Sequence, residues 1–421
     1  MSDATHKPDA PPDRRVRRLA AMKRTDHWLG LPLCFLLGLA ATVARAILRR
    51  PRPSIAGNRP IAVFKFFGLG SIVEATPLLR AIRTRYPHAP LVFVSFSGNR
   101  ELLELSGLCQ HVYVIRTGGI GVFARDVLAT VWRLRQIRVQ AVVDLELFSK
   151  FSTLLAFASG APVRVGYHLN DFWRYSLVTH PVNYNYFRHL SDVFCEAGEA
   201  IDAPVARRAL EPFSLPPAAR QAALALLESH GWRRGQRLLG VNVNAAELSL
   251  ERRWPLDRFA AVIERLLAAD AQLRVVLTGS GDEQGYVEQI LPFLSATARQ
   301  RTIVGCGRLS LAEFLAAVEL MDVLLTNDSG PLHLAAAQGA AIVSIWGPTR
   351  PAFYAPAVAN HRAVFADYRC SPCVGLFTTF EGMWCGRAAW CMQMIEPPAV
   401  AEAVEAMLAQ APRTAASQEA P

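Results

Sequence analysis

The chain has 421 residues, of which 52% are hydrophobic and 19% charged, so it can bury sizeable cores and is not globally disordered. Its length predicts two or three domains. The formal net charge is +10, but residues 1–52 hold eleven Lys/Arg and four Asp, a net +7, which leaves +3 for the remaining 369 residues. The body therefore lacks the basic stripe with interleaved aromatic residues that is typical of nucleic-acid binders, and we expect no nucleic-acid partner.

Residues 1–57 are predicted to form a basic arm and a membrane-associating helix. The run from Trp28 to Ala44 has 17 residues without a charge, about 25 Å as a helix, which is short of the ~30 Å hydrocarbon core. Basic residues on both sides leave its orientation undecided and would attract anionic lipid headgroups. Three interpretations of this run remain: a helix that lies in the membrane interface, a helix that spans the membrane, and a helix that packs on the protein. A secretory signal is disfavoured by the central Arg of Ala44-Arg45-Ala46 and by the long preceding arm.

Residues 58–214 show short apolar runs that alternate with longer amphipathic ones. This alternation predicts right-handed βαβ units and a parallel sheet. The expected strands are Ile61–Phe67, Leu91–Phe96, Val112–Ile115 and Ala141–Leu147, and the expected helices are Ser71–Arg85 and Phe123–Gln136.

The same rhythm starts again in residues 215–410. Ser310 and Glu313 have the spacing of a capping box, which predicts that a helix begins at Leu311. Two doubly wound halves, hinged near Glu211–Pro217, would enclose a cleft, and residues 411–421 are predicted to be a disordered tail. The expected strands are Leu238–Val243, Arg274–Thr278, Thr302–Val304, Val323–Thr326 and Ala341–Ile345, and the expected helices are Leu256–Ala269, Asp282–Pro292, Leu311–Met321 and Pro331–Gln338.

The first glycine turn follows the first predicted strand. Gly68 and Gly70 are followed by Val73, where a dinucleotide fingerprint has its third glycine. This departure disfavours a nicotinamide oxidoreductase. A strand, a tight turn and a helix start at the carboxyl edge of a sheet remain, and ligands bind there in open α/β folds. On this segment alone, a plain βα turn is the favoured interpretation.

The second half has a more specific pattern. The residues from Thr326 to Pro331 end a strand and open a helix, and backbone N–H groups at a helix start, with Gly for close approach and Pro in the first turn, form an anion cradle. His333 lies four residues after Ser329, so both can face one ligand. A second Gly/Pro loop follows the next strand at Trp346-Gly347-Pro348-Thr349. Two alternative interpretations remain: Asp328 is simply the N-cap of the helix, and His333 is a packed core residue.

Four cysteines gather near the C-terminus. One Cys-x2-Cys with two further thiols has a spacing that suits a structural zinc site. Reduced thiols, or a disulfide in an exported protein, are the alternatives. No catalytic metal is expected, and the candidate ligands are Cys370, Cys373, Cys385 and Cys391.

These motifs resemble glycosyltransferase family 9, the ADP-heptose:lipopolysaccharide heptosyltransferases. The residues from Asn327 to Ala337, with those from Trp346 to Pro351, are similar to its donor-site signature. Three further motifs fit in the family's order, over about residues 58–410. They are Gly68–Arg80, Asn242–Ala245 with Arg252–Pro255, and Cys370–Met392.

The resemblance implies a GT-B fold, with an acceptor domain in residues 58–214 and a nucleotide-sugar domain in residues 215–410. It also implies inverting transfer without a cofactor, a donor such as ADP-heptose, and a lipopolysaccharide-core or other envelope glycan acceptor at the cytoplasmic face of the inner membrane. Arg252 would clamp the diphosphate, and Asp282 or Glu283 would face the ribose. Carried over by position, the donor-binding residues are Asn244, Arg252, Asp282, Glu283, Asp328, Ser329, Gly330 and His333, and the acceptor-side loop contains Gly68 and Gly70.

One departure concerns the general base. The family has an Asp where this chain has Ser71, and a serine hydroxyl alone cannot take the acceptor's proton. Glu146 is the first replacement candidate, because the carboxyl edge of a sheet opens to the cleft. Glu74 is the second candidate. The alternative interpretation is that Glu74 is simply a solvated residue on its helix. A catalytically inactive sugar-nucleotide-binding homologue is the alternative function.

Overall fold

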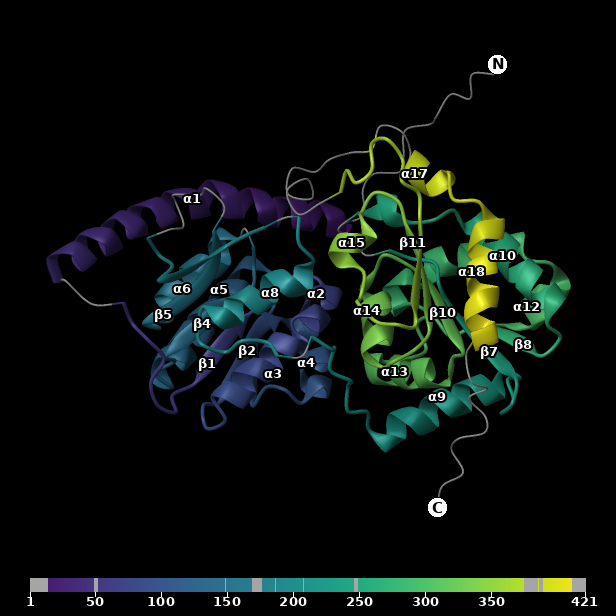
Figure 1. Cartoon of the computed structure of the whole chain (residues 1–421), viewed down its shortest axis with the longest axis horizontal. Coiled ribbons are helices and arrows are strands. Elements are labelled where there is room, and N and C mark those ends of the chain that lie inside the picture. Colours follow the sequence, from purple (N-terminus) through teal and green to yellow (C-terminus); the bar gives the residue numbers. More distant parts are fainter. Residues whose placement is uncertain are drawn as a thin grey trace.

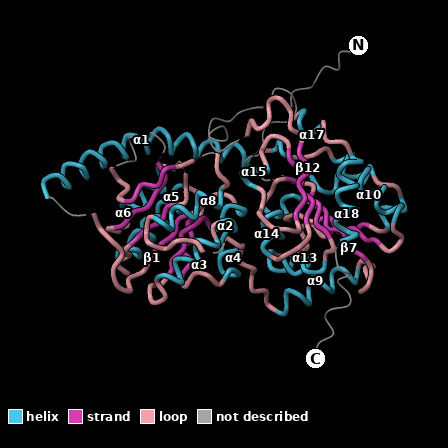
Figure 2. Tube along the Cα trace, viewed as in Figure 1, coloured by secondary structure: helices cyan, strands magenta, loops and turns pink. Residues whose placement is uncertain are grey.

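The computed structural model describes residues 14–48, 52–147, 149–168, 176–185, 187–206, 208–245, 249–374, 385 and 389–410. The predicted tail at 411–421 therefore lies outside the described residues, as does most of the segment between Cys373 and Cys391. The described chain forms two six-stranded, parallel sheets side by side, each flanked by helices (Figures 1 and 2). This confirms the predicted pair of doubly wound halves.

The first sheet has the strand order β3-β2-β1-β4-β5-β6. Its central strand β1 lies between β2 and β4, with Ile61 opposite both Leu91 and Ala141. Every residue of β1 and β4 is buried, because helices cover both faces of the sheet. The strands are β1 Ile61–Phe64, β2 Leu91–Phe96, β3 His111–Ile115, β4 Ala141–Asp144, β5 Val163–His168 and β6 His180–Asn183. The helices are α2 Leu69–Glu74, α3 Thr76–Arg85, η1 Ser97–Asn99, α4 Arg100–Ser106, α5 Ile120–Gln136, α6 Lys150–Ala158 and α8 Leu190–Glu199.

The second sheet repeats this topology in the order β12-β11-β10-β7-β8-β9. Its central strands are again fully buried. The strands are β7 Arg237–Asn242, β8 Leu273–Leu277, β9 Thr302–Val304, β10 Val323–Asn327, β11 Ile342–Trp346 and β12 His361–Phe365. The helices are α9 Pro217–Ser229, η2 Leu250–Arg252, α10 Leu256–Ala269, η3 Gly281–Glu283, α11 Gln284–Val287, η4 Glu288–Phe293, α12 Ala296–Gln300, α13 Leu311–Leu320, α14 Gly330–Ala337, α15 Pro351–Tyr354, α17 Trp390–Gln393 and α18 Pro397–Gln410.

Strand order reverses beside β1 in the first sheet and beside β7 in the second. In open α/β sheets the crevice at this reversal, beyond the carboxyl ends of the strands, is where ligands bind. The loops after β1, β4, β7 and β10 therefore define the region in which a site is expected. Helix α2 of the first domain packs against α14 of the second, so these loops face one another across the domain boundary.

Several predicted elements differ from the observed ones. The predicted helix Ser71–Arg85 is two helices, α2 and α3, that meet at Ala75, with a proline in the first turn of α3. The predicted helix Asp282–Pro292 is a series of short turns, of which the last contains Pro292. Strands β5, β6 and β12 were not predicted. Of these, β12 is only partly buried, so its sequence lacks an apolar run.

The capping box at the start of α13 is confirmed. The Ser310 hydroxyl accepts from the Glu313 backbone N–H at 3.3 Å, and the Glu313 carboxylate accepts from the Ser310 N–H at 2.8 Å. Helix α9 packs on α13 in the second domain, whereas α8 packs on α3 in the first. The chain therefore passes from one sheet to the other between α8 and α9.

Helix α1, Arg14–Leu48, lies along the first domain and packs against α6 (Figure 1). The Asp26 carboxylate accepts from the backbone N–H groups of Lys150 and Phe151, at 3.1 and 2.6 Å, at the start of α6. Cys34 is buried, and a Cβ added to Gly30 would lie 2.5 Å from the Lys150 Cβ. These contacts repeat every four residues, so one face of α1 is docked on the domain. The segment Arg24–Ala44 is long and apolar enough to cross a membrane.

Candidate functional site

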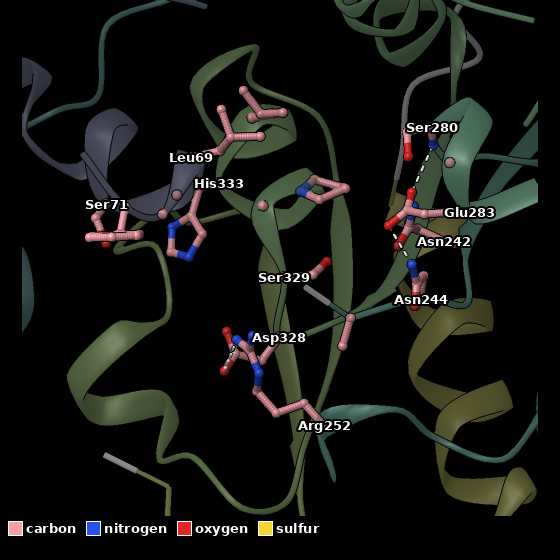
Figure 3. A pocket seen from close by; sticks show the side chains of 18 of the residues that line it. Leu69, Ser71, Asn242, Asn244, Arg252, Ser280, Glu283, Asp328, Ser329 and His333 are labelled. Atoms are coloured by element: carbon pink, nitrogen blue, oxygen red, sulfur yellow. Dashed lines mark hydrogen bonds and ion pairs between the residues drawn. The ribbon is translucent and has the colours of Figure 1, made fainter. Parts of the chain in front are cut away.

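A cavity of about 1130 Å³ opens between the two sheets and is lined by both domains. The first domain contributes the loops after β1 and β4, and the second contributes the loops after β7, β8 and β10. Figure 3 shows Leu69 and Ser71 of the first domain facing residues of the second. Twelve of the predicted site residues line it: Gly68, Gly70, Ser71, Glu146, Asn244, Arg252, Asp282, Glu283, Asp328, Ser329, Gly330 and His333. Among the described predicted residues outside the cysteine cluster, Glu74 alone is not part of this lining.

The start of α14 lies at this cavity. Ser329 occupies the N-cap position with extended backbone, but among the described residues no side chain caps the helix. The Ser329 hydroxyl instead lies 3.1 Å from the Thr326 hydroxyl. The first N–H groups of a helix lack intrahelical partners and carry a partial positive charge, so an uncapped start favours an anionic group.

Asp328 is not a helix cap, because its carboxylate binds side chains from two other loops. Arg252 Nη1 lies 3.3 Å from Asp328 Oδ2, and the Thr349 hydroxyl donates to the same oxygen at 2.7 Å. The Arg252 and Asp328 side chains are 12% and 7% exposed. The guanidinium therefore sits beside the start of α14, where it can turn to a diphosphate.

The loops after β7 and β8 form a second polar group of side chains (Figure 3). The Asn244 amide donates to the Glu283 carboxylate and accepts from Arg253 Nε at 2.6 Å. Glu283 also accepts from the Ser280 N–H at 2.7 Å as part of a capping box. The Arg253 guanidinium lies 3.9 Å from the centre of the Tyr286 ring. Glu283 is thus engaged in the loop itself, whereas Asp282 is exposed in the cavity wall.

Glu146 lies two residues beyond the end of β4 and binds the loop after β1. Its Oε1 accepts from Lys65 Nζ at 2.9 Å, from the Phe66 N–H at 2.6 Å and from the Phe67 N–H at 3.0 Å. The Lys65 and Glu146 side chains are 8% and 6% exposed. Glu146 therefore reaches the cavity, as the sequence predicted, but its charge is used to hold Lys65 and the β1 loop.

Glu74 is not a solvated helix residue, and that interpretation is wrong. It is 2% exposed, and its Oε1 lies 2.9 Å from Nδ1 of His333, which belongs to the other domain. The two side chains form a buried contact between α2 and α14. Gly70, one turn earlier on α2, makes room for the imidazole, since a Cβ there would lie 2.4 Å from His333 Cδ2.

Two residues of this site were not singled out from the sequence. Lys65 is a single cation inside an otherwise apolar run, and a buried charge requires a partner. That observation would have pointed to a carboxylate on the neighbouring strand. Thr349 falls in the second Gly/Pro loop, but nothing in its sequence context indicated that its hydroxyl would bind Asp328.

The C-terminal cysteines are partly described. Burial and the nearby thiols of Cys373, Cys385 and Cys370 together raise the pKa of Cys391 to about 11. The pKa of Cys373 is also raised, mainly by burial and to a smaller extent by the neighbouring thiols of Cys385 and Cys370. The four sulfurs thus share one corner of the second domain. Within the described part of the chain, no group of three His, Cys, Asp or Glu side chains has the arrangement of a metal site.

The model of glycosyltransferase family 9 (heptosyltransferase) matches residues 129–383 of the chain. The chain belongs to this family. Lipooligosaccharide heptosyltransferase 2 of Haemophilus influenzae is 28% identical over 159 residues, which are 38% of this chain and 44% of that protein. The chain thus matches less than half the length of this curated relative.

Solved structures extend the likeness to both domains. The glycosyltransferase family 9 protein of Veillonella parvula superimposes with a TM-score of 0.69 at 22% identity, over 84% of this chain and 97% of that one. An Escherichia coli heptosyltransferase with ADP-2-deoxy-2-fluoro heptose has a TM-score of 0.60 at 15% identity, over 82% and 99%. At these identities the likeness is one of fold, and the predicted GT-B fold is confirmed.

Proposed function

We propose that the chain is an inverting, metal-independent glycosyltransferase that moves a heptose-like sugar from a nucleotide-sugar donor to a lipopolysaccharide-core or other envelope glycan acceptor. One observation carries the proposal. The uncapped start of α14 lies in an interdomain cavity beside the Arg252 guanidinium. A helix start and an arginine are a favourable pair for a diphosphate, the charged part of the donor and of the leaving group. The related E. coli heptosyltransferase was solved with an ADP-sugar, which supports a donor of this class.

The remaining donor contacts follow from this placement. Asp328, Ser329 and Gly330 would surround the diphosphate and the sugar, and Asp282 would face the ribose hydroxyls from the cavity wall. Glu283 and Asn244 would hold the loop that carries Asp282. The acceptor would enter from the side of Gly68, Gly70 and Ser71.

Binding of nucleotide sugars to the purified protein tests this proposal directly. A ligand that binds only the folded state raises the melting temperature by mass action. We expect ADP-heptose to stabilise the chain and Arg252→Ala to abolish most of this shift. The shift is measured relative to the ligand-free form of each protein, because Arg252→Ala also removes the partner of the buried Asp328 carboxylate. Transfer is expected to persist in EDTA. A panel of nucleotide sugars and free nucleotides that produces no shift would contradict the proposal.

The N-terminal helix is proposed to hold the enzyme at the inner surface of the cytoplasmic membrane. Asp26, Gly30 and Cys34 dock α1 on α6, within the very segment that is long enough to span. A helix docked in this way cannot cross a bilayer unless the folded domain enters the hydrocarbon. We therefore favour a helix that lies in the interface, with its apolar face in the lipid. That face contains Trp28, Leu29, Leu33, Phe35, Leu36, Leu39, Val43 and Ile47, all between 48% and 73% exposed.

Flotation with vesicles tests this orientation. Leu29→Glu with Leu36→Glu should release the protein from vesicles that contain phosphatidylglycerol, because each change puts a charge on the lipid-facing side of α1. Phe293→Glu, at an exposed apolar residue of the second domain, is the matched control and should leave vesicle binding unchanged. An N-terminal tag should also resist protease added outside spheroplasts. Cleavage of the tag under these conditions would show a span.

The four C-terminal cysteines are proposed to hold a structural zinc ion. Their mutual effect on the pKa values of Cys373 and Cys391 indicates that the thiols are neighbours, but in the described residues they do not have the arrangement of a metal site, so zinc would have to draw them together. Four thiolates suit zinc, which would tie the segment after β12 to the second domain. Elemental analysis should give one zinc per chain and none for Cys373→Ser. Protein purified without chelators that contains no zinc, and in which all four thiols react with a thiol reagent, would contradict this site.

A further inference from the structure

The site leaves the proton of the acceptor hydroxyl without an obvious destination. Ser71 replaces the family's Asp, and a hydroxyl cannot remove a proton unaided. Glu146, the first candidate from the sequence, accepts three hydrogen bonds at its Oε1, one of them from the Lys65 ammonium. A proton on this carboxyl would remove the charge that pairs with the buried Lys65 ammonium, which lies 2.9 Å away. Its geometry is that of a residue that positions the β1 loop.

His333 and Glu74 form the other ionisable pair at the cavity. Glu74 lies behind the cavity wall, whereas His333 lines the cavity. An ionised carboxylate only accepts, so Glu74 Oε1 fixes the imidazole proton on Nδ1 at 2.9 Å. Nε2 is then the unprotonated nitrogen. It lies on the side of Gly70, where an added Cβ would be 3.0 Å away.

This arrangement brings together the two substrates' domains. His333 is one turn after the uncapped start of α14, where the donor's diphosphate is proposed to bind. Glu74 and Gly70 belong to α2, which borders the acceptor side (Figure 3 shows Ser71 of this helix beside His333). An imidazole oriented by a buried carboxylate is the arrangement by which proteins make histidine a general base.

We propose that His333 is the general base of the transfer and that Glu74 is its positioning residue. This inference rests on the proposed function and deepens it. The acceptor oxygen forms a bond with the anomeric carbon while the bond from that carbon to the diphosphate oxygen breaks. The proton of the acceptor hydroxyl passes to His333 Nε2, and the bonding electron pair leaves with the nucleoside diphosphate. Glu74 stabilises the imidazolium that results.

The experiment compares Glu74→Gln, His333→Gln and the double variant in the full-length protein, with ADP-heptose and a lipopolysaccharide-core acceptor. Each single variant should lower kcat by on the order of 10²–10⁴-fold. The double variant should be no slower than the slower single one, because two residues that act as a unit are not additive. Donor affinity by calorimetry should be unchanged. Glu101→Gln is the matched control, since its carboxylate also joins the two domains, accepting from the Ala312 N–H at 3.1 Å.

Three outcomes would overturn the pair. The first is that Glu74→Gln and His333→Gln both keep a kcat near that of the wild type. The second is a loss that appears wholly in donor affinity, which would make His333 a donor-binding residue. The third is an equal loss of kcat in Glu101→Gln, which would make domain contact the cause. If His333→Gln does not fold, Glu74→Gln decides alone. Wild-type protein that binds the donor but transfers nothing would overturn the proposed function itself.

Discussion

Gly70→Ala is the sharpest structural perturbation of the site. A Cβ at this position would lie 2.4 Å from Cδ2 and 3.0 Å from Nε2 of His333. Carbon atoms pack at about 3.5 Å or more, so the imidazole and α2 must separate by about 1 Å. A displacement of this size in a reacting group can cost about 10²-fold in rate. We therefore expect kcat to fall by about 10²-fold, with a loss of unfolding free energy of about 1–3 kcal/mol from overpacking.

The assay measures initial rates of acceptor glycosylation and, separately, donor binding by calorimetry. Gly121→Ala is the matched control. Gly121 is also the second residue of its helix, α5, and a Cβ there would meet nothing within 4 Å. Its kcat should equal that of the wild type. If Gly70→Ala turns over as fast as Gly121→Ala, the imidazole does not need its observed position, and the reasoning about His333 fails.

Four further predictions concern other parts of the molecule. Arg252→Ala should raise the donor Kd by about 10-fold or more, as measured by calorimetry, because it removes a charged hydrogen-bond donor beside α14. Glu146→Gln should lower the free energy of urea unfolding by about 3 kcal/mol, since Lys65 loses its buried partner; Lys65→Met in the same chain should restore part of this loss. The pKa of His361 is lowered from 6.5 to about 4, mainly by burial and to a smaller extent by the nearby His333. The unfolded chain then takes up the proton first, so stability should fall as the pH drops from about 6.5 to 4, and His361→Gln should reduce this fall in urea titrations. Ser310→Ala should lower the free energy of unfolding by about 1 kcal/mol through the lost helix cap, as measured by urea titration.

Elements with local signals could be predicted from the sequence. The buried central strands are continuous apolar runs, and the capping box marks the start of α13. The glycine turn and the residues from Asp328 to His333 fall at the carboxyl edges of their sheets, because parallel strands bring such loops together. Partly buried strands such as β12 lack an apolar run, and so they escape this kind of reasoning.

Contacts between the domains could not be predicted in the same way. Glu74 and His333 are 259 residues apart, and neither helix indicates which residue of the other it will meet. Glu146 could be located at the cavity, but the Lys65 ammonium that binds it depends on the register of β1 beside β4. The pairing of Glu74 with His333, and so the proposal of His333 as the base, therefore required the packing of α2 on α14.

The stereochemistry and stoichiometry of the reaction test the central claim most directly. Wild-type protein would be incubated with ADP-heptose and a lipopolysaccharide-core acceptor, and the product examined by NMR and mass spectrometry. We predict one nucleoside diphosphate released for each sugar transferred, with an anomeric configuration in the product opposite to that in the donor. Retained configuration, or donor consumed without any glycosylated acceptor, would contradict an inverting transferase whose base takes the acceptor's proton.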